Sequence, residues 1–311
     1  MLTYAPRPLP DSPPVSFLLL LAVWLGLFCW AGPVPAQFHF KDYGPHPRLT
    51  PPDAILSRGA LLIRADTGEV LYARNPDERL LPASTTKLMT ALIVYEKLGG
   101  FKGSVTIEDR DRAEPSNIPV VPGETISVNT LFHALLIESA NDSARALGRA
   151  VAGSNEAFVG MMNQRALAMG LFNTRFDNPN GLPAPAGTHY TSCADLMSIF
   201  RHVLAYPELA RILSTKEYVI RTESGTHVLR NHNRLLGYYP GMGPAKTGWT
   251  EASRHTYACA VTQNGHTLLL TLLDSPNKWL DAQILFNWGC AQVASQPAST
   301  AQPAPSGLAP R

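Results

Sequence analysis

Charged residues are scarce in this sequence, and those present nearly cancel. Only 16% of its 311 residues are Asp, Glu, Lys or Arg, with 26 basic residues against 24 acidic ones and a net charge of +2. This balance excludes a disordered polyelectrolyte and gives no reason to expect nucleic acid as a partner. A hydrophobic content of 45% over this length is enough to build a buried core.

Cysteine is scarce as well. Once Cys29 in the N-terminal apolar segment is set aside, Cys193, Cys259 and Cys290 remain. Three thiols cannot all pair within one chain, so at most one disulfide can form, and we expect buried free thiols. Their spacing does not resemble a zinc site, and we expect neither a metal nor another cofactor.

Proline is unevenly distributed, and its distribution divides the chain. Eleven of the 27 prolines lie in residues 1–52 and four lie in residues 290–311. We predict a signal peptide over residues 1–36, a proline-rich lead-in over 37–58 and a globular domain over 59–289. The remaining residues, 290–311, form an Ala/Pro-rich tail that we expect to be disordered.

The N-terminal segment indicates the compartment. An uncharged apolar run from Val15 to Ala31 follows Arg7 and precedes the small-residue exit G-P-V-P-A, which ends at Ala36. This order is typical of a secretory signal, so we expect export to the periplasm or the cell-wall space. The run also reaches the lower length limit of a membrane-spanning helix, so an uncleaved segment would leave the protein membrane-associated.

Hydrophobic spacing predicts strands near both ends of the domain and helices between them. A hairpin is expected over 59–74, and the Asn264-Gly265 turn predicts a second one from strands 257–262 and 267–273. Further helices are expected at about 128–137, 141–152, 156–169, 194–205 and 279–288, after a first helix that enters at Pro82 and ends at Gly99-Gly100. This order favours an α+β fold, with an antiparallel sheet built from both chain ends and a helical block packed against it.

The tetrapeptide S-T-T-K at 84–87 places a hydroxyl and an amine on one face of a helix start. Free backbone N–H groups stabilise negative charge there, and a lysine one turn later can take the serine proton if it is neutral. A neutral lysine requires burial or a nearby cation that lowers its pKa. Taken alone, the pattern also fits an N-cap serine beside an exposed lysine, and S-P-N-K at 275–278 repeats it in what we expect to be a solvated turn.

Two other short motifs could serve a hydrolytic site. S-A-N at 139–141 lies in a bend between two predicted helices, where serine can transfer a proton and asparagine can bind an amide. K-T-G at 246–248 can bind a carboxylate, and its glycine lets a substrate backbone approach closely. A helix cap and an ordinary turn are the respective alternatives when each motif is taken alone.

Together, the motifs follow the order S-x-x-K, S-x-N and K-T-G, which is the motif set of penicillin-binding proteins and class A β-lactamases. With the longer stretches P-A-S-T-T-K-L-M-T-A, L-L-I-E-S-A-N-D-S-A, F-D-N-P-N-G-L and K-T-G-W-T, residues 59–288 resemble the D-alanyl-D-alanine carboxypeptidase family of low-molecular-mass penicillin-binding proteins. The resemblance implies the β-lactamase/transpeptidase-like fold and an exported serine DD-peptidase. Such an enzyme trims the terminal D-Ala of peptidoglycan stem peptides through an acyl-enzyme and is inhibited covalently by β-lactams; no stable protein partner is implied.

Site residues implied by the resemblance form three groups. The nucleophile and its general base are Ser84 and Lys87. The second catalytic pair, which relays protons and holds the substrate amide, is Ser139 and Asn141. The substrate-binding segment is Lys246, Thr247, Gly248 and Trp249, with the first two binding the substrate carboxylate. The oxyanion hole would use the backbone N–H groups of Ser84 and Trp249.

Several alternatives stay open at this point. The same motifs support a DD-endopeptidase that cleaves peptidoglycan crosslinks. A class A β-lactamase would need a glutamate that activates water, and the loop over 176–187 contains none. A peptidoglycan-binding protein without catalysis is disfavoured because all three motifs are intact. One departure bears on the width of the cleft, since Ser253 and Arg254 stand where the family commonly has Ala-Gly.

Overall fold

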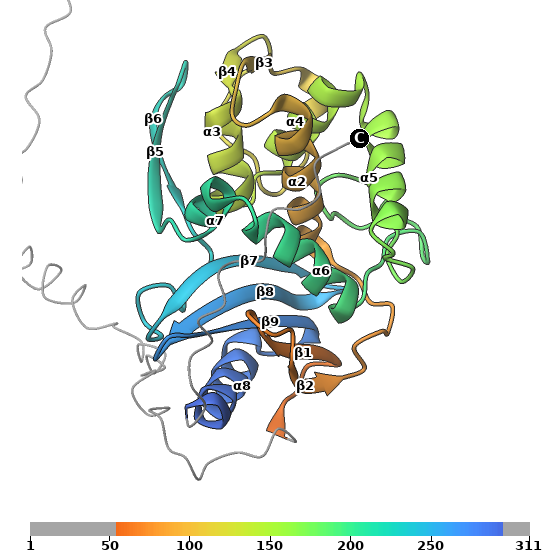
Figure 1. Cartoon of the computed structure of the whole chain (residues 1–311). Coiled ribbons are helices and arrows are strands. Elements are labelled where there is room, and N and C mark those ends of the chain that lie inside the picture. The colour runs from red at the N-terminus through yellow and green to blue at the C-terminus, as the bar shows by residue number, and fades with distance from the viewer. Residues whose placement is uncertain (1–53, 295–311) are drawn as a thin grey trace, which may run out of the picture. The chain divides into compact units, whose positions relative to one another are not determined.

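A five-stranded antiparallel sheet with helices on both of its faces forms the centre of the structure (Figure 1). The computed structural model describes residues 54–294. The predicted signal peptide, most of the predicted lead-in and residues 295–311 of the predicted tail lie outside the described residues. Within 54–294, no helix combines the length and apolar character needed to cross a bilayer.

The strand order of this sheet is β2-β1-β9-β8-β7. Two strands come from one end of the domain, β1 (Gly59–Arg64) and β2 (Val70–Arg74). The other three come from the opposite end, β7 (Met242–Thr250), β8 (Arg254–Gln263) and β9 (His266–Ser275). The predicted antiparallel sheet from both chain ends is therefore confirmed, and β7, which carries K-T-G, lies at its edge.

The turn between β8 and β9 forms at Asn264-Gly265, as predicted. Asn264 and Gly265 have φ values of 51° and 78°, the left-handed conformation that two-residue hairpin turns require at both central positions. The register then pairs Gln263 with His266.

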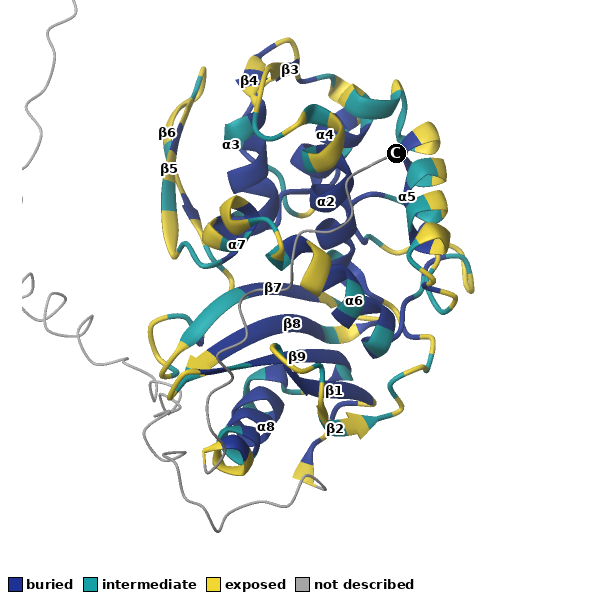
Figure 2. Ribbon diagram, in the orientation of Figure 1, coloured by how far each residue is buried: buried dark blue, intermediate teal, exposed yellow. Residues whose placement is uncertain are grey.

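A buried helix, α2 (Lys87–Leu98), lies at the centre of the helical block (Figure 2). Its first eight residues, 87–94, are all buried, which is typical of a helix enclosed on every side. The helices α4 (Asn141–Ala152), α5 (Asn155–Ala168) and α6 (Cys193–Leu204) pack around it. α6 lies on one face of the sheet, and α8 (Lys278–Val293) covers the other face.

Most predicted helices agree with the structure to within one residue, but the helix predicted at 279–288 continues to Val293, and the helix predicted at 128–137 changes type. It begins as α3 (Val128–His133) and continues as the π-helical turn η5 (Ala134–Glu138). The spacing did not predict several elements. They are β3 (Ser104–Thr106), η4 (Asp109–Asp111), β4 (Thr125–Ser127), α7 (Pro207–Leu213), β5 (Glu217–Thr222), β6 (Gly225–Arg230) and the edge strand β7.

The structure buries residues on both sides of the predicted domain limits, 59 and 289. Ile55 and Ser57 are almost fully buried, and α8 continues to a buried Val293. The predicted free thiols are confirmed, since Cys193 and Cys259 are buried and Cys290 is partly buried, with none of them in a disulfide.

The expectation of a solvated turn at 275–278 is wrong. Ser275 is fully buried, and Lys278 is only 5% exposed. The cause is Asp281, a buried carboxylate that accepts hydrogen bonds from the hydroxyls of Ser275, at 2.7 Å, and of Ser57. A buried carboxylate needs such donors, and these two hold the turn from β9 into α8 against the segment that precedes β1.

Candidate active site

Ser84 lies in the short 3-10 helix η3 (Ala83–Thr86), which leads directly into α2. The carbonyl of Pro82 fixes this turn, because it accepts hydrogen bonds from the hydroxyls of Thr85, at 2.6 Å, and of Thr256 on β8, at 2.8 Å. The serine hydroxyl consequently stands at the start of a buried helix and faces a cavity.

Lys87 is fully buried one turn after Ser84, and its amine contacts three oxygens. Nζ lies 3.0 Å from Ser84 Oγ, 2.7 Å from Asn141 Oδ1 and 2.7 Å from the carbonyl oxygen of Asn180. The side-chain amide of Asn141 is oriented by its Nδ2, which donates to the Ala113 carbonyl at 2.9 Å. Both Asn141 Oδ1 and the Asn180 carbonyl can only accept hydrogen bonds.

Burial strongly lowers the pKa of Lys87, and the neighbouring Lys246 lowers it further, against a smaller opposite effect of Asp142. A neutral amine has two N–H bonds and one lone pair. Since the two amide oxygens must take the N–H bonds, the lone pair is left for the Ser84 hydroxyl. The arrangement therefore makes Lys87 an acceptor for the serine proton.

The bend that carries Ser139 depends on the π-helical turn η5. Ser139 ends this turn in the left-handed conformation, with φ 64°, and Asn141 begins α4 two residues later. Asp142 then ties the facing loop to the bend, because its carboxylate accepts from the backbone N–H of Ile118 at 2.9 Å and from that of Ser143 at 2.6 Å.

Lys246 on β7 is a second buried amine, and it lies behind Ser139. Its Nζ donates to Ser139 Oγ at 2.8 Å and to the carbonyl of Thr247 at 2.8 Å. Burial, and next Lys278, lower the pKa of Lys246 to about 7. Of the two residues expected to bind a carboxylate, only Thr247 lines the cavity.

Gly248 allows β7 to pass directly beside Ser84. A Cβ at this position would lie 2.8 Å from the backbone nitrogen of Ser84 and 2.3 Å from Thr256 Oγ1. Gly181 plays the same part on the other side of η3, where its φ is +83° and a Cβ would lie 1.8 Å from the Ala83 carbonyl oxygen. The two glycines let η3 fit between β7 and the loop that supplies the Asn180 carbonyl.

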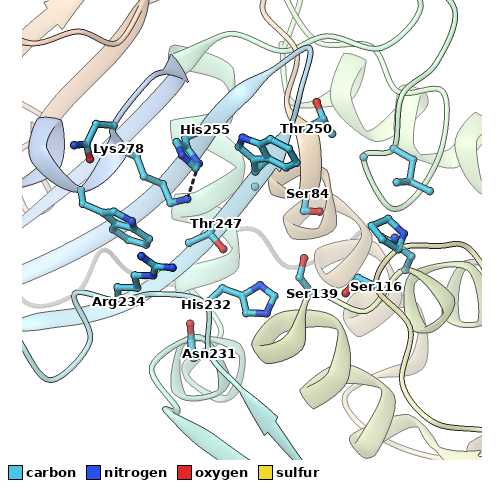
Figure 3. A pocket seen from close by; sticks show the side chains of 18 of the residues that line it. Ser84, Ser116, Ser139, Asn231, His232, Arg234, Thr247, Thr250, His255 and Lys278 are labelled. Carbon is cyan, nitrogen blue, oxygen red and sulfur yellow. Dashed lines mark hydrogen bonds between the residues drawn. The ribbon is translucent and has the colours of Figure 1, made fainter. Parts of the chain in front are cut away.

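These elements surround a cavity of about 750 Å³ with Ser84 between its two sides (Figure 3). Figure 3 shows Ser116 on one side of Ser84, and Arg234, His255 and Lys278 on the other, which is the side of Thr247. The remaining lining residues are Pro115, Ser139, Asn141, Gly181, Leu182, Asn231, His232, Gly248, Trp249, Thr250, Pro276, Asn277 and Trp279.

Sequence reasoning missed two sets of residues at this site. The first is the Asn180 carbonyl, a backbone group within F-D-N-P-N-G-L, a stretch that resembles the family but carries no reactive side chain. The second is the set of cations beside Thr247, where Lys278 was assigned to a solvated turn. Its Nζ instead lies 3.0 Å from His255 Nδ1 and 4.5 Å from the ring centre of Trp279. In residues 54–294, no group of three or more His, Cys, Asp or Glu is arranged to hold a metal ion.

Residues 47–277 match the model of the D-alanyl-D-alanine carboxypeptidase family. The chain belongs to this family. This result confirms the resemblance drawn from the three motifs, and it agrees with the fold, since a sheet from both chain ends with a helical block is the architecture implied by that resemblance.

Several known D-alanyl-D-alanine peptidases align with more than three quarters of this chain. D-alanyl-D-alanine carboxypeptidase DacF of Bacillus subtilis is 34% identical over 252 residues, which are 78% of this chain and 64% of that protein. A D-alanyl-D-alanine endopeptidase of Pseudomonas aeruginosa is 32% identical over 255 residues, 79% of this chain and 81% of that protein. The crystal structure of a D-alanyl-D-alanine carboxypeptidase from Mycobacterium tuberculosis superposes with a TM-score of 0.73 at 30% identity, covering 78% of this chain and 94% of that one.

We predict that the free energy of unfolding of the wild type, relative to that of Lys87→Met, rises with pH as the pH approaches the pKa of a free lysine. Burial lowers the pKa of folded Lys87 well below the 10.5 of a free lysine, which unfolding restores. Between these two pKa values the unfolded state binds more protons than the folded state, so raising the pH favours folding by at most about 1.4 kcal/mol per pH unit. Urea denaturation of both proteins across this range measures the difference.

Lys97→Met, at the exposed end of the same helix, is the matched control and is expected to follow the wild-type curve. Parallel pH curves for the wild type and Lys87→Met would show that Lys87 stays charged when folded.

Proposed function

We propose that this chain is an exported serine D-alanyl-D-alanine carboxypeptidase that removes the terminal D-Ala of peptidoglycan stem peptides through an acyl-enzyme. The contacts of Lys87 carry this proposal, because two obligate acceptors direct its N–H bonds away from Ser84 and leave its lone pair facing the serine hydroxyl. Membership of the family and the carboxypeptidases among the relatives support the substrate class.

Acylation begins when Ser84 Oγ attacks the carbonyl carbon of the penultimate D-Ala and passes its proton to Lys87 Nζ. The oxyanion that forms accepts hydrogen bonds from the backbone N–H groups of Ser84 and Trp249, in the manner of an oxyanion hole. When the peptide C–N bond breaks, the nitrogen of the leaving D-Ala takes up the proton held by Lys87, relayed through Ser139. The products of this step are free D-Ala and a peptidyl ester of Ser84.

In deacylation, water is the nucleophile and the Ser84 oxygen is the leaving group. A water molecule attacks the ester carbonyl and gives its proton to Lys87, and the C–O bond to Ser84 then breaks as the serine oxygen takes the proton back. Asn141 holds the amide of the acyl group while also fixing the Lys87 amine. One lysine thus serves both steps.

The substrate carboxylate defines the leaving-group side of the cavity. Thr247 offers a hydroxyl there, and Lys278 offers a nearly buried ammonium, so a charge-assisted hydrogen bond is available. Lys246 acts from beneath this side, through its contact with Ser139. The free C-terminus of a stem peptide satisfies this arrangement, whereas an internal peptide bond would leave the cation unpaired.

Two other functions receive less support. A β-lactamase needs a carboxylate that activates water beside the ester, and within the described chain no Asp or Glu lines the cavity. A non-catalytic binding protein does not require a buried amine, such as that of Lys87, within hydrogen-bond distance of a serine hydroxyl. The site of action, in the periplasm or the cell-wall space, follows from the substrate and from the N-terminal segment.

We predict that Ser84→Ala abolishes both release of D-Ala from a pentapeptide ending in D-Ala-D-Ala and covalent labelling by penicillin, while the protein still folds. Removing one hydroxyl from a short turn leaves the contacts of Pro82 and Lys87 with other residues intact. Mass spectrometry of the peptide and of the intact protein measures both effects.

Ser198→Ala, on α6 outside the cavity, is the matched control and should keep both activities. A penicillin adduct on the peptide that contains Ser275, the serine of the second S-x-x-K, would overturn the assignment of the nucleophile.

We also predict that the penicilloyl-enzyme persists for minutes while peptide turnover continues much faster. The opened β-lactam stays attached to the ester and obstructs water, and no carboxylate in the lining can activate it. Intact-protein mass spectrometry at intervals after a pulse of penicillin follows the adduct. Loss of the adduct within a second, with hydrolysis of excess penicillin, would instead identify a β-lactamase.

A further inference from the structure

The cavity beside Ser84 is larger than the two alanine residues at the end of a stem peptide require. At about 750 Å³, the whole cavity falls in the range that encloses a drug-sized ligand. Two alanine residues fill only a small part of such a space. Arg234, His255 and Lys278 line the Thr247 side, and each comes from a different segment of the chain.

The same side carries more positive charge than one carboxylate neutralises. Arg234 and Lys278 both line it, and within the described chain the lining includes no aspartate or glutamate. Glu138 lies 3.7 Å from His232 and accepts the backbone N–H of Arg230, but it is not part of the lining. An uncompensated pair of cations in a cleft attracts anions.

The two cations differ in their surroundings. Lys278 is 5% exposed, and its amine is held by His255 Nδ1, which must accept because an ammonium can only donate. Burial, and next Lys278 itself, lower the pKa of His255 to about 4, so this ring is neutral and adds no charge. Arg234, in contrast, is exposed, and no hydrogen bond or ion pair joins its guanidinium to another residue in the described part of the chain.

We propose that Arg234 binds a second carboxylate on the leaving amino acid, so that this site favours a dicarboxylic leaving group over one of similar size that lacks the second carboxylate. The proposal rests on the proposed function, since it places the α-carboxylate of the leaving residue on Thr247 and Lys278. The second carboxylate then extends to Arg234, whose fork of N–H donors suits a carboxylate. The bond broken is the same peptide bond, and the dicarboxylic amino acid departs as the free amine after taking up a proton.

Two sources could supply such a leaving group. One is a stem peptide that ends in an acidic D-amino acid. The other is a crosslink whose amine component is a diaminodicarboxylic acid with a free second carboxylate, and its cleavage would be endopeptidase activity. Both present the same chemistry to Arg234, and matched pairs of substrates separate them.

The experiment measures kcat/KM for one acyl peptide carrying different leaving groups on its penultimate D-Ala. D-Glu is compared with its uncharged isostere D-Gln, and meso-diaminopimelate, joined through its D-centre amine, is compared with D-lysine, which lacks the second carboxylate. We expect the wild type to prefer the dicarboxylic member by about tenfold or more, the effect of one charge-assisted hydrogen bond. Arg234→Gln is expected to bring this ratio close to one, and Arg234→Lys to retain part of it.

Arg221→Gln, an exposed arginine on β5 outside the cavity, is the matched control and should keep the wild-type ratio. A preference in either pair that depends on Arg234 supports the proposal and identifies the source of the second carboxylate. Equal kcat/KM values within both substrate pairs, or a preference that Arg234→Gln leaves unchanged, would overturn this inference. If D-Ala is still released, the proposed function stands. No release from any substrate, D-Ala included, would count against the proposed function itself.

Discussion

The catalytic arrangement depends on one buried amine held between two groups that can only accept hydrogen bonds. Lys87 is enclosed by α2, α4 and the loop that carries Asn180, so its charged form has no water to stabilise it. Each neighbouring feature serves that enclosure. The π-helical turn η5 delivers Asn141 at the start of α4, and Gly181 lets the Asn180 loop press against η3. Together they convert an ordinary helix start into a serine with an adjacent proton acceptor.

Four basic residues form a series that begins at the buried Lys87 and ends at the exposed Arg234. Lys246 lowers the pKa of Lys87, Lys278 lowers that of Lys246, and Arg234 lowers that of Lys278. Burial is the larger effect at each lysine and decreases toward the outer end, where the pKa of Lys278 is still about 8. The inner amine is therefore the one that gives up its proton, while the outer cations stay charged. An anion bound at the outer end would offset the repulsion, so substrate binding and the protonation of Lys246 are electrostatically linked.

Sequence patterns were most informative where local spacing decides the structure. The strands β1, β2, β8 and β9, the Asn264-Gly265 turn and α4 follow from periodicity and turn chemistry, and the three motifs led to residues that line the cavity or lie directly behind its lining. Sequence patterns gave wrong predictions where a contact with a residue far away in the sequence determines the local structure. Nothing near Ser275 indicates that Asp281, together with Ser57 from the other end of the domain, buries that turn and brings Lys278 to the site. The Asn180 carbonyl was not predicted for a different reason, because every residue has a backbone carbonyl and the residue type does not indicate which of them accepts a hydrogen bond in the site.

The protonation state of Lys87 tests this account most directly. Nitrogen NMR of the protein with 15N-labelled lysine side chains reports whether each Nζ is an amine or an ammonium, and loss of one signal in Lys87→Met assigns the resonance. The account predicts a neutral amine for Lys87 near neutral pH, with Ser84 present and no substrate bound. An ammonium signal for Lys87 that persists up to the pKa of a free lysine, about 10.4, would contradict it.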